Sequence, residues 1–177
     1  MNVVVLGASS QIGCFLLPLL TTEGFEVIAV SRRASTSRPS TNRSIRWIHT
    51  SAELDSDRQK VTTLVSCGPL GLAKDWVDAL PELQRCIAFS STSVHTKQTI
   101  EIAALRDSER QLQQTVANRA VALCLLRPTL IYGCGLDRNI SQLYGFGKRW
   151  GRIPVSRRSE GLRQPCLLYT SDAADDL

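Results

Sequence analysis

A short segment with a glycine at each end constrains the fold of this chain more than any other feature of its sequence. Residues Val3 to Leu6 form an apolar, β-branched run, and Gly7-Ala-Ser-Ser-Gln-Ile-Gly13 follows it directly. From Ile12 to Leu20, apolar side chains recur at the spacing i, i+3, i+4, i+7 and i+8, which is the period of a helix. The sequence therefore predicts a strand, a tight turn and an amphipathic helix in immediate succession.

The rest of the chain repeats this alternation of strand and helix. Further strands are expected at residues 26–30, 45–48, 61–65, 86–90 and 121–126, and helices around 76–83 and over 101–118. Strands that alternate with helices pair in parallel through right-handed crossovers. We therefore expect an α/β fold with a doubly wound, mostly parallel sheet.

Composition excludes several classes of protein. No run approaches the ~20 apolar residues of a membrane span, and the N-terminus lacks the features of a signal peptide, so we expect a cytoplasmic protein without a membrane partner. The six cysteines form no C-x-x-C pair, and no metal site is predicted. The net charge of +5 comes without a nucleic-acid recognition motif, so no nucleic-acid partner is expected.

The segment from Gly7 to Gly13 has the context of a dinucleotide-binding fingerprint, between a strand and a helix. Gly7 permits the tight turn, Gly13 permits close packing of the helix on the strand, and the helix N-terminus offers N–H groups to a pyrophosphate. Ser10 stands where a middle glycine is usual. The predicted cofactor-binding residues here are Gly7, Ser9, Ser10, Gln11, Ile12 and Gly13.

The end of the second expected strand bears on the choice of cofactor. It reads Val30-Ser31-Arg32-Arg33, where a carboxylate would bind the ribose hydroxyl of NAD and arginine would accommodate the 2′-phosphate of NADP. We therefore predict that Arg32 and Arg33 bind the cofactor and that NADP is favoured over NAD. Solvated surface arginines are the alternative interpretation.

Three motifs in order give the chain a resemblance to a known family. They are the Gly7 to Gly13 loop, Phe89-Ser-Ser-Thr-Ser-Val-His95 and Leu126-Arg-Pro-Thr-Leu-Ile-Tyr-Gly133. Together they resemble the extended short-chain dehydrogenase/reductases, the NAD-dependent epimerase/dehydratase family, over residues 1 to about 140. The resemblance implies a Rossmann fold, a catalytic Ser91 that hydrogen-bonds the reacting hydroxyl or carbonyl, and a Pro128 that flanks the nicotinamide.

The chain departs from that family where the family carries Tyr-x-x-x-Lys, with tyrosine as acid/base and lysine lowering its pKa. On the helix between the second and third motifs, Leu105 and Glu109 stand in the two places, and no tyrosine occurs between Ser91 and Tyr132. Tyr144-Gly-Phe-Gly-Lys148 matches the pattern literally, but it follows the Arg-Pro motif, so we interpret it as a coincidence.

The last residues differ in character from the rest. Residues 166–177 resemble translated sequencing adapter and are treated as a non-native tail. We therefore expect a Rossmann domain at 1–135 and, at 136–165, only the beginning of a substrate domain in a natural protein longer than this chain.

Three functions follow from these patterns. The first is an NAD(P)-dependent oxidoreductase or epimerase/dehydratase acting on a nucleotide sugar or another small carbonyl or hydroxyl substrate. The second is a non-catalytic NADP-binding sensor or structural protein, because the Tyr-x-x-x-Lys pair is missing. The third and weakest is a polyanion-binding module driven by the basic clusters. A homodimer is left open.

Overall fold

The structure is a computed structural model that describes residues 2–32, 44–96, 98–133, 135–137, 140–153 and 165–168. Contacts within the chain define two compact units, residues 1–127 and 128–177. The boundary between these two units follows Arg127, and the Rossmann-domain boundary expected at residue 135 stays a prediction.

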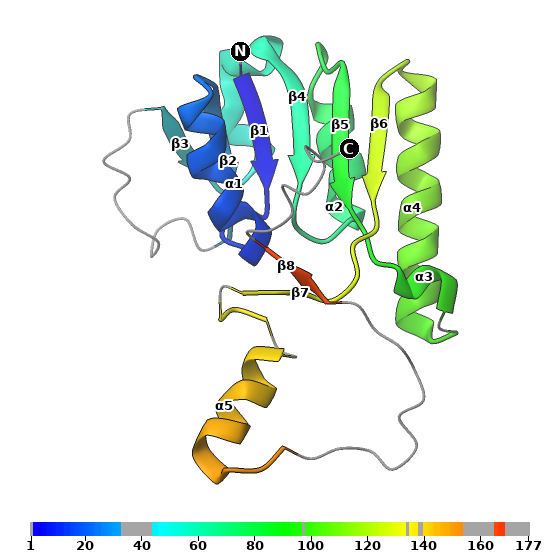
Figure 1. Ribbon diagram of the computed structural model, residues 1–177. Coiled ribbons are helices and arrows are strands. Elements are labelled where there is room, and N and C mark those ends of the chain that lie inside the picture. The colour runs from blue at the N-terminus through cyan, green and yellow to red at the C-terminus, as the bar shows by residue number, and fades with distance from the viewer. Residues whose placement is uncertain are drawn as a thin grey trace, which may run out of the picture. The chain divides into compact units, whose positions relative to one another are not determined.

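A single parallel sheet of six strands forms the centre of the first unit (Figure 1). The strand order is β3-β2-β1-β4-β5-β6, so the chain starts in the middle of the sheet, builds outwards to β3 and then crosses over to β4. This is the doubly wound Rossmann arrangement that the sequence predicted. The strands are β1 (Asn2–Leu6), β2 (Glu26–Val30), β3 (Ile45–Ile48), β4 (Val61–Ser66), β5 (Arg85–Phe89) and β6 (Ala122–Leu126).

Helical segments connect these strands. The longest is α4, which begins one residue before the expected start and ends at the expected Asn118. One connection, the 3-10 helix η1, was not expected from the sequence. The helical segments of this unit are α1 (Gln11–Thr22), η1 (Ser51–Lys60), α2 (Gly71–Ala79), α3 (Ser93–Thr96) and α4 (Ile100–Asn118).

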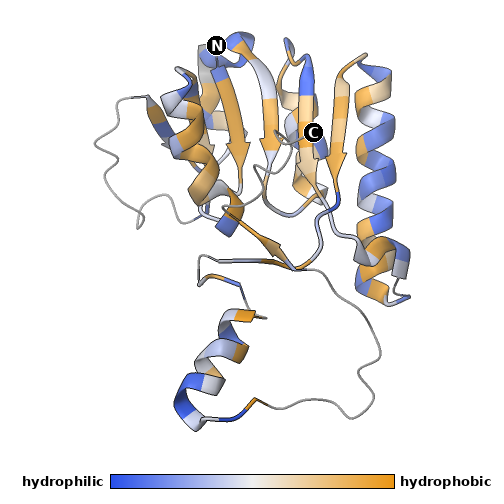
Figure 2. Ribbon diagram, viewed as in Figure 1, coloured by the Kyte–Doolittle hydropathy of each residue, from blue (hydrophilic) through white to orange (hydrophobic). Residues whose placement is uncertain are grey.

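The two faces of the sheet carry separate hydrophobic cores. Val4, Leu6 and Leu64 point to the face that α2 and α4 cover, where they pack with Val77 and Leu112. The alternate residues of the same strands point to the other face and pack against α1. Figure 2 shows hydrophobic residues along these strands, as expected for strands buried on both faces.

The α1 face is covered only in part within the described residues. An apolar groove of about 460 Å³ lies there, lined by residues of α1 and of four strands. Ile87 and Phe89 of β5 are half-buried in it, and Leu126 of β6 is 40% exposed.

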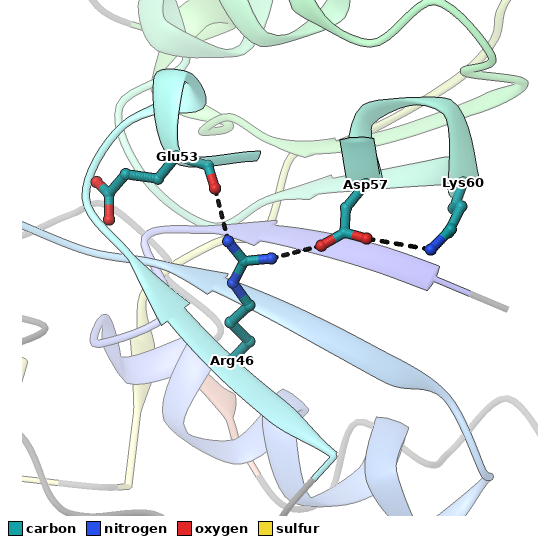
Figure 3. Close-up of polar contacts among 4 residues, drawn as sticks. All are labelled: Arg46, Glu53, Asp57 and Lys60. Atoms are coloured by element: carbon teal, nitrogen blue, oxygen red, sulfur yellow. Dashed lines mark hydrogen bonds and ion pairs between the residues drawn. The ribbon is translucent and has the colours of Figure 1, made fainter. Parts of the chain in front are cut away.

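A polar network fixes η1 to the edge strand β3 (Figure 3). Arg46 of β3 donates to the backbone carbonyl of Glu53 at 2.6 Å and pairs with the carboxylate of Asp57. The Glu53 carboxylate accepts from the backbone N–H groups of His49 and Thr50, both at 2.9 Å. This capping carboxylate therefore orders the turn that follows β3.

Among its described residues, the second unit contains a two-stranded parallel ladder and one helix. The ladder joins β7 (Ile131–Tyr132) to β8 (Cys166–Leu167), so the start of the tail that the sequence excluded is paired here, while residues 169–177 lie outside the described residues. The helix α5 (Ile140–Trp150) contains Tyr144, whose side chain is exposed. In the part of the chain that is described, no helix is both long and apolar enough to cross a membrane.

Candidate functional site

The turn between β1 and α1 requires glycine at both ends, because the backbone conformation and nearby backbone atoms leave no room for a side chain. Gly7 has φ +67°, and a Cβ atom there would lie 2.6 Å from the backbone nitrogen of Gly68. A Cβ atom on Gly13 would lie 2.6 Å from the carbonyl oxygens of Gly7 and Ala8. A side chain at Gly7 would therefore meet the backbone that follows β4, in addition to the strain of its positive φ, and a side chain at Gly13 would push the helix away from the strand. The sequence expected Gly7 to permit the tight turn and Gly13 to permit the close packing of the helix on the strand.

Ser10 is the N-cap of α1. Its hydroxyl accepts from the backbone N–H of Gly13 at 3.1 Å, which satisfies one of the donors that every helix start leaves without an intrahelical partner. The first turn of α1 contains no acidic residue. The positive end of the helix dipole is thus not neutralised by a neighbouring carboxylate of that turn, and the site fits a phosphate group.

The end of β2 lies next to this turn. The backbone N–H of Ala8 donates to the carbonyl of Val30 at 3.1 Å, and the hydroxyls of Ser9 and Ser31 are 2.6 Å apart. Arg32 follows with an exposed side chain. The structure thus brings Arg32 to the strand end beside the glycine turn, whereas Arg33 lies outside the described residues.

Gly68 is a site residue that the sequence reading missed. It follows β4 closely, and its backbone packs against Gly7, because a Cβ atom on Gly68 would lie 3.3 Å from the Gly7 Cα. The sequence showed it only as part of a Gly-Pro-Leu-Gly turn. The available signal was a glycine shortly after β4, the strand that pairs with β1. This signal can be used only when the strand order is known.

The turn after β5 carries the predicted catalytic serine. The Ser91 hydroxyl accepts from the backbone N–H of Ser93 at 3.2 Å, and the Ser91 carbonyl accepts from that of Val94. Ser91 thereby stabilises the turn that leads into α3 and keeps a hydroxyl proton that can be donated elsewhere. The neighbouring Ser90 Oγ is buried and makes no hydrogen bond of normal geometry.

A partly buried ion pair lies between α4 and the end of β6. The Arg127 guanidinium donates from Nε and Nη2 to the two carboxylate oxygens of Glu109, at 2.9 and 2.8 Å. The Glu109 side chain is 9% exposed and that of Arg127 is 31% exposed. This hydrogen-bonded guanidinium lowers the pKa of Glu109 below its ordinary value, and the nearby Ser90 hydroxyl contributes in the same direction.

The structure supplies no tyrosine and lysine pair on α4. Leu105 is partly buried against the core between the sheet and its helices, and Glu109 is held by Arg127. Tyr144 and Lys148 lie on α5 in the second unit. Within the described residues, no three His, Cys, Asp or Glu side chains are placed to hold a metal ion.

The predicted residues of the first unit collect at one edge of the sheet. In a parallel sheet all strands end at the same edge, so the segments after β1, β2, β4, β5 and β6 meet there (Figure 1). Pro128 directly follows Arg127 and is the first residue of the second unit. The segments concerned carry Gly7, Ser9, Ser10, Gln11, Ile12 and Gly13 after β1, Arg32 after β2, Gly68 after β4, Ser91 after β5 and Arg127 after β6.

Comparison of the sequence with family models and with curated proteins finds no match. Solved structures do match the fold. The structure of MoeE5 with UDP-glucose and NAD has a TM-score of 0.73 and 20% identity, over 96% of this chain and 68% of that one. The dTDP-glucose 4,6-dehydratase of Bacillus anthracis with NAD has a TM-score of 0.79 and 10% identity, over 99% and 70%.

A third solved structure extends the pattern. The UDP-glucose 4-epimerase of Thermotoga maritima with UDP-glucose has a TM-score of 0.70 and 14% identity, over 96% of this chain and 70% of that one. At these identities the likeness establishes the fold alone. The chain therefore has the Rossmann fold that is also found in nucleotide-sugar epimerases and dehydratases.

Proposed function

We propose that this chain binds a nicotinamide dinucleotide across the carboxyl edge of its sheet. The observation that carries the proposal is the turn from Gly7 to Gly13, in which both glycines allow backbone contacts that no other residue would permit, at the N-terminus of a helix without an acidic first turn. The ligands named for the similar structures, NAD with a UDP- or dTDP-sugar enzyme, support the same cofactor class.

The favoured form of the cofactor is NADP. Arg32 carries a full positive charge at the end of β2, and Ser31 stands before it in place of a carboxylate that would repel a 2′-phosphate. The hydroxyls of Ser9 and Ser31 are hydrogen-bonded to each other at 2.6 Å and place two polar side chains beside the proposed 2′-phosphate position. From the sequence alone, we propose that Arg33 also binds the 2′-phosphate.

We further propose an oxidoreductase or epimerase/dehydratase-type reaction on a nucleotide sugar or another small carbonyl or hydroxyl substrate. When bound, the nicotinamide supplies hydride transfer. Ser91 would donate its hydroxyl proton as a hydrogen bond to the substrate oxygen, while its own oxygen stays fixed by the N–H of Ser93. Pro128, which follows Arg127 in the chain, would flank the nicotinamide.

A second candidate function is binding without redox chemistry. It is favoured by α4, where Leu105 cannot transfer a proton and the Glu109 carboxylate is occupied by Arg127. Turnover separates the two candidates. A protein that binds NADPH, but does not oxidise it when any sugar or carbonyl substrate is added, fits only the second candidate. If turnover is found and Ser91→Ala retains it in full, Ser91 has no part in the mechanism.

The experiment that tests the binding site is a fluorescence titration of the chain with NADPH and with NADH. We expect NADPH to bind more tightly, and Arg32→Ala to weaken NADPH about tenfold, the effect of losing one charge-assisted hydrogen bond of ~1.5 kcal/mol, with little change for NADH. Gly7→Val should abolish both, because its side chain would meet the backbone of Gly68.

The matched control is Arg110→Ala, which removes an exposed arginine from α4. If this control weakens NADPH as much as Arg32→Ala, the effect of Arg32 is one of net charge and the 2′-phosphate assignment is wrong. If neither cofactor binds to the wild-type chain, the proposal fails. Binding that weakens steeply with salt for any polyanion would instead favour the polyanion-binding function.

A further inference from the structure

Helix α4 makes two polar contacts that bracket the turn after β5. Arg106 donates from Nε to the carbonyl of Val94 in α3 at 2.7 Å. One helical turn further on, Glu109 holds Arg127 at the end of β6 through two hydrogen bonds. The segment from Ser90 to Val94, which contains Ser91, is therefore fixed from the same helix at its far end and, through β6, at its near end.

The strand register places Ser90 beside this ion pair. Phe89 pairs with Leu126 in the ladder, and the N–H of Ser90 donates to the carbonyl of Leu126 at 2.8 Å. Ser90 and Arg127 are therefore the next residues in register after this pair, and both lie on the face of the sheet that α4 covers. The buried Ser90 hydroxyl lies near the Glu109 carboxylate, whose pKa it helps to lower.

The ion pair between Glu109 and Arg127 has the burial and geometry of a structural contact. Its carboxylate is nearly buried, and both guanidinium contacts have normal hydrogen-bond lengths, which is the bidentate geometry that orients both groups. Removing the carboxylate charge would leave a partly buried guanidinium without its partner, and Arg127 would have to turn towards water. The contact that ties the end of β6 to α4 beside Ser90 would then be lost.

We propose that Glu109 and Arg127 are positioning residues that hold the Ser90–Ser91 turn in place for the nicotinamide half of the dinucleotide. The proposal rests on the proposed function. The dinucleotide would cross the edge between β1 and β4, with its 2′-phosphate at Arg32 after β2, so its other half extends towards β5 and β6. The pair thus acts on one half of the ligand only.

The test compares two ligands on the same variants. NADPH reaches both halves of the site, whereas adenosine 2′,5′-bisphosphate reaches only the half beside Arg32. Glu109→Gln keeps the shape of the side chain and removes its charge, so we expect NADPH to bind about tenfold more weakly and the bisphosphate to bind as before. Arg127→Lys, which keeps the charge but loses the bidentate geometry, should behave in the same way.

The matched control is Asp107→Asn, which removes the carboxylate of an exposed ion pair with Arg110 on the same helix. It should change neither affinity. The exchange of both charges, Glu109→Arg with Arg127→Glu, should recover part of the NADPH affinity. If the pair served only stability, its loss and its recovery would affect the binding of NADPH and of the bisphosphate alike.

The outcomes separate the two proposals. If wild type binds NADPH and Glu109→Gln leaves that affinity unchanged, or weakens both ligands equally, the positioning role is overturned and the dinucleotide site stands. If wild type binds neither ligand, the proposed function fails and the positioning role fails with it.

Discussion

At the scale of single residues, the close approach of Gly7 and Gly68 leaves no room for a side chain. Gly68→Ala would place a Cβ atom 3.3 Å from the Gly7 Cα and 3.4 Å from its nitrogen, both backbone atoms that cannot rotate away. We expect the free energy of unfolding to fall by about 1–2 kcal/mol and NADPH binding to weaken, since the fingerprint turn must shift. Urea denaturation and titration measure the two effects.

Gly71→Ala is the matched control for that prediction. Its Cβ atom would meet only the Ser108 hydroxyl at 3.6 Å, an ordinary contact, at the first residue of α2. We expect unchanged or slightly raised stability, by up to about 1 kcal/mol, because alanine has less freedom than glycine in the unfolded chain. Equal losses for Gly68→Ala and Gly71→Ala would contradict a specific role for Gly68.

At the scale of elements, we propose that the start of α1 combines stability with ligand binding, whereas the start of α4 serves stability alone. Ser10 and Thr99 are the N-caps of these helices and accept from the backbone N–H groups of Gly13 and Ile102. Replacing either by alanine should lower the free energy of unfolding by about 1 kcal/mol, less for Thr99, whose bond is longer at 3.4 Å. Only Ser10→Ala should weaken NADPH binding, and a weakening by Thr99→Ala would argue against a site at α1.

At the scale of the whole molecule, groups whose pKa values differ between the folded and unfolded states limit stability at both ends of the pH range. Contacts in the folded state lower the pKa values of Glu53 and Glu109 below 4.5, so the stability they contribute is present above pH 4.5 and is lost as the pH falls below it. Burial raises the pKa of Cys67 to about 12 and that of Cys86 to about 11 from 9.0, so their contribution is present below pH 9 and is lost above it.

Urea denaturation from pH 3 to pH 11 should therefore show a plateau between about pH 4.5 and 9, bounded by these linked groups. Glu109→Gln should lower the plateau and flatten the decline on the acid side, because the variant has one linked carboxylate fewer. A decline of the same depth in wild type and variant would show that Glu109 is not held by Arg127 in solution.

Much of the fold follows from local sequence. The apolar period marks β1 and α1, and β2 and β3 have the bounds expected from their β-branched runs. The 3-10 helix η1 escaped notice because it has no hydrophobic period, and its order comes from polar contacts with Arg46 and from the Glu53 cap. Helix α5 was hidden by its glycines, whose helix-breaking tendency is only a weak local preference.

The sequence by itself determined the glycine turn between β1 and α1 and the turn after β5 that carries Ser91, because each depends on residues adjacent in the chain. Only the tertiary structure decided that Gly68 packs on Gly7 and that Glu109 binds Arg127, contacts that span 61 and 18 positions of sequence. Such contacts arise when strand order brings β4 beside β1 and when α4 crosses back to β6. No local pattern encodes them, because the free energy that selects them comes from burying both faces of the completed sheet.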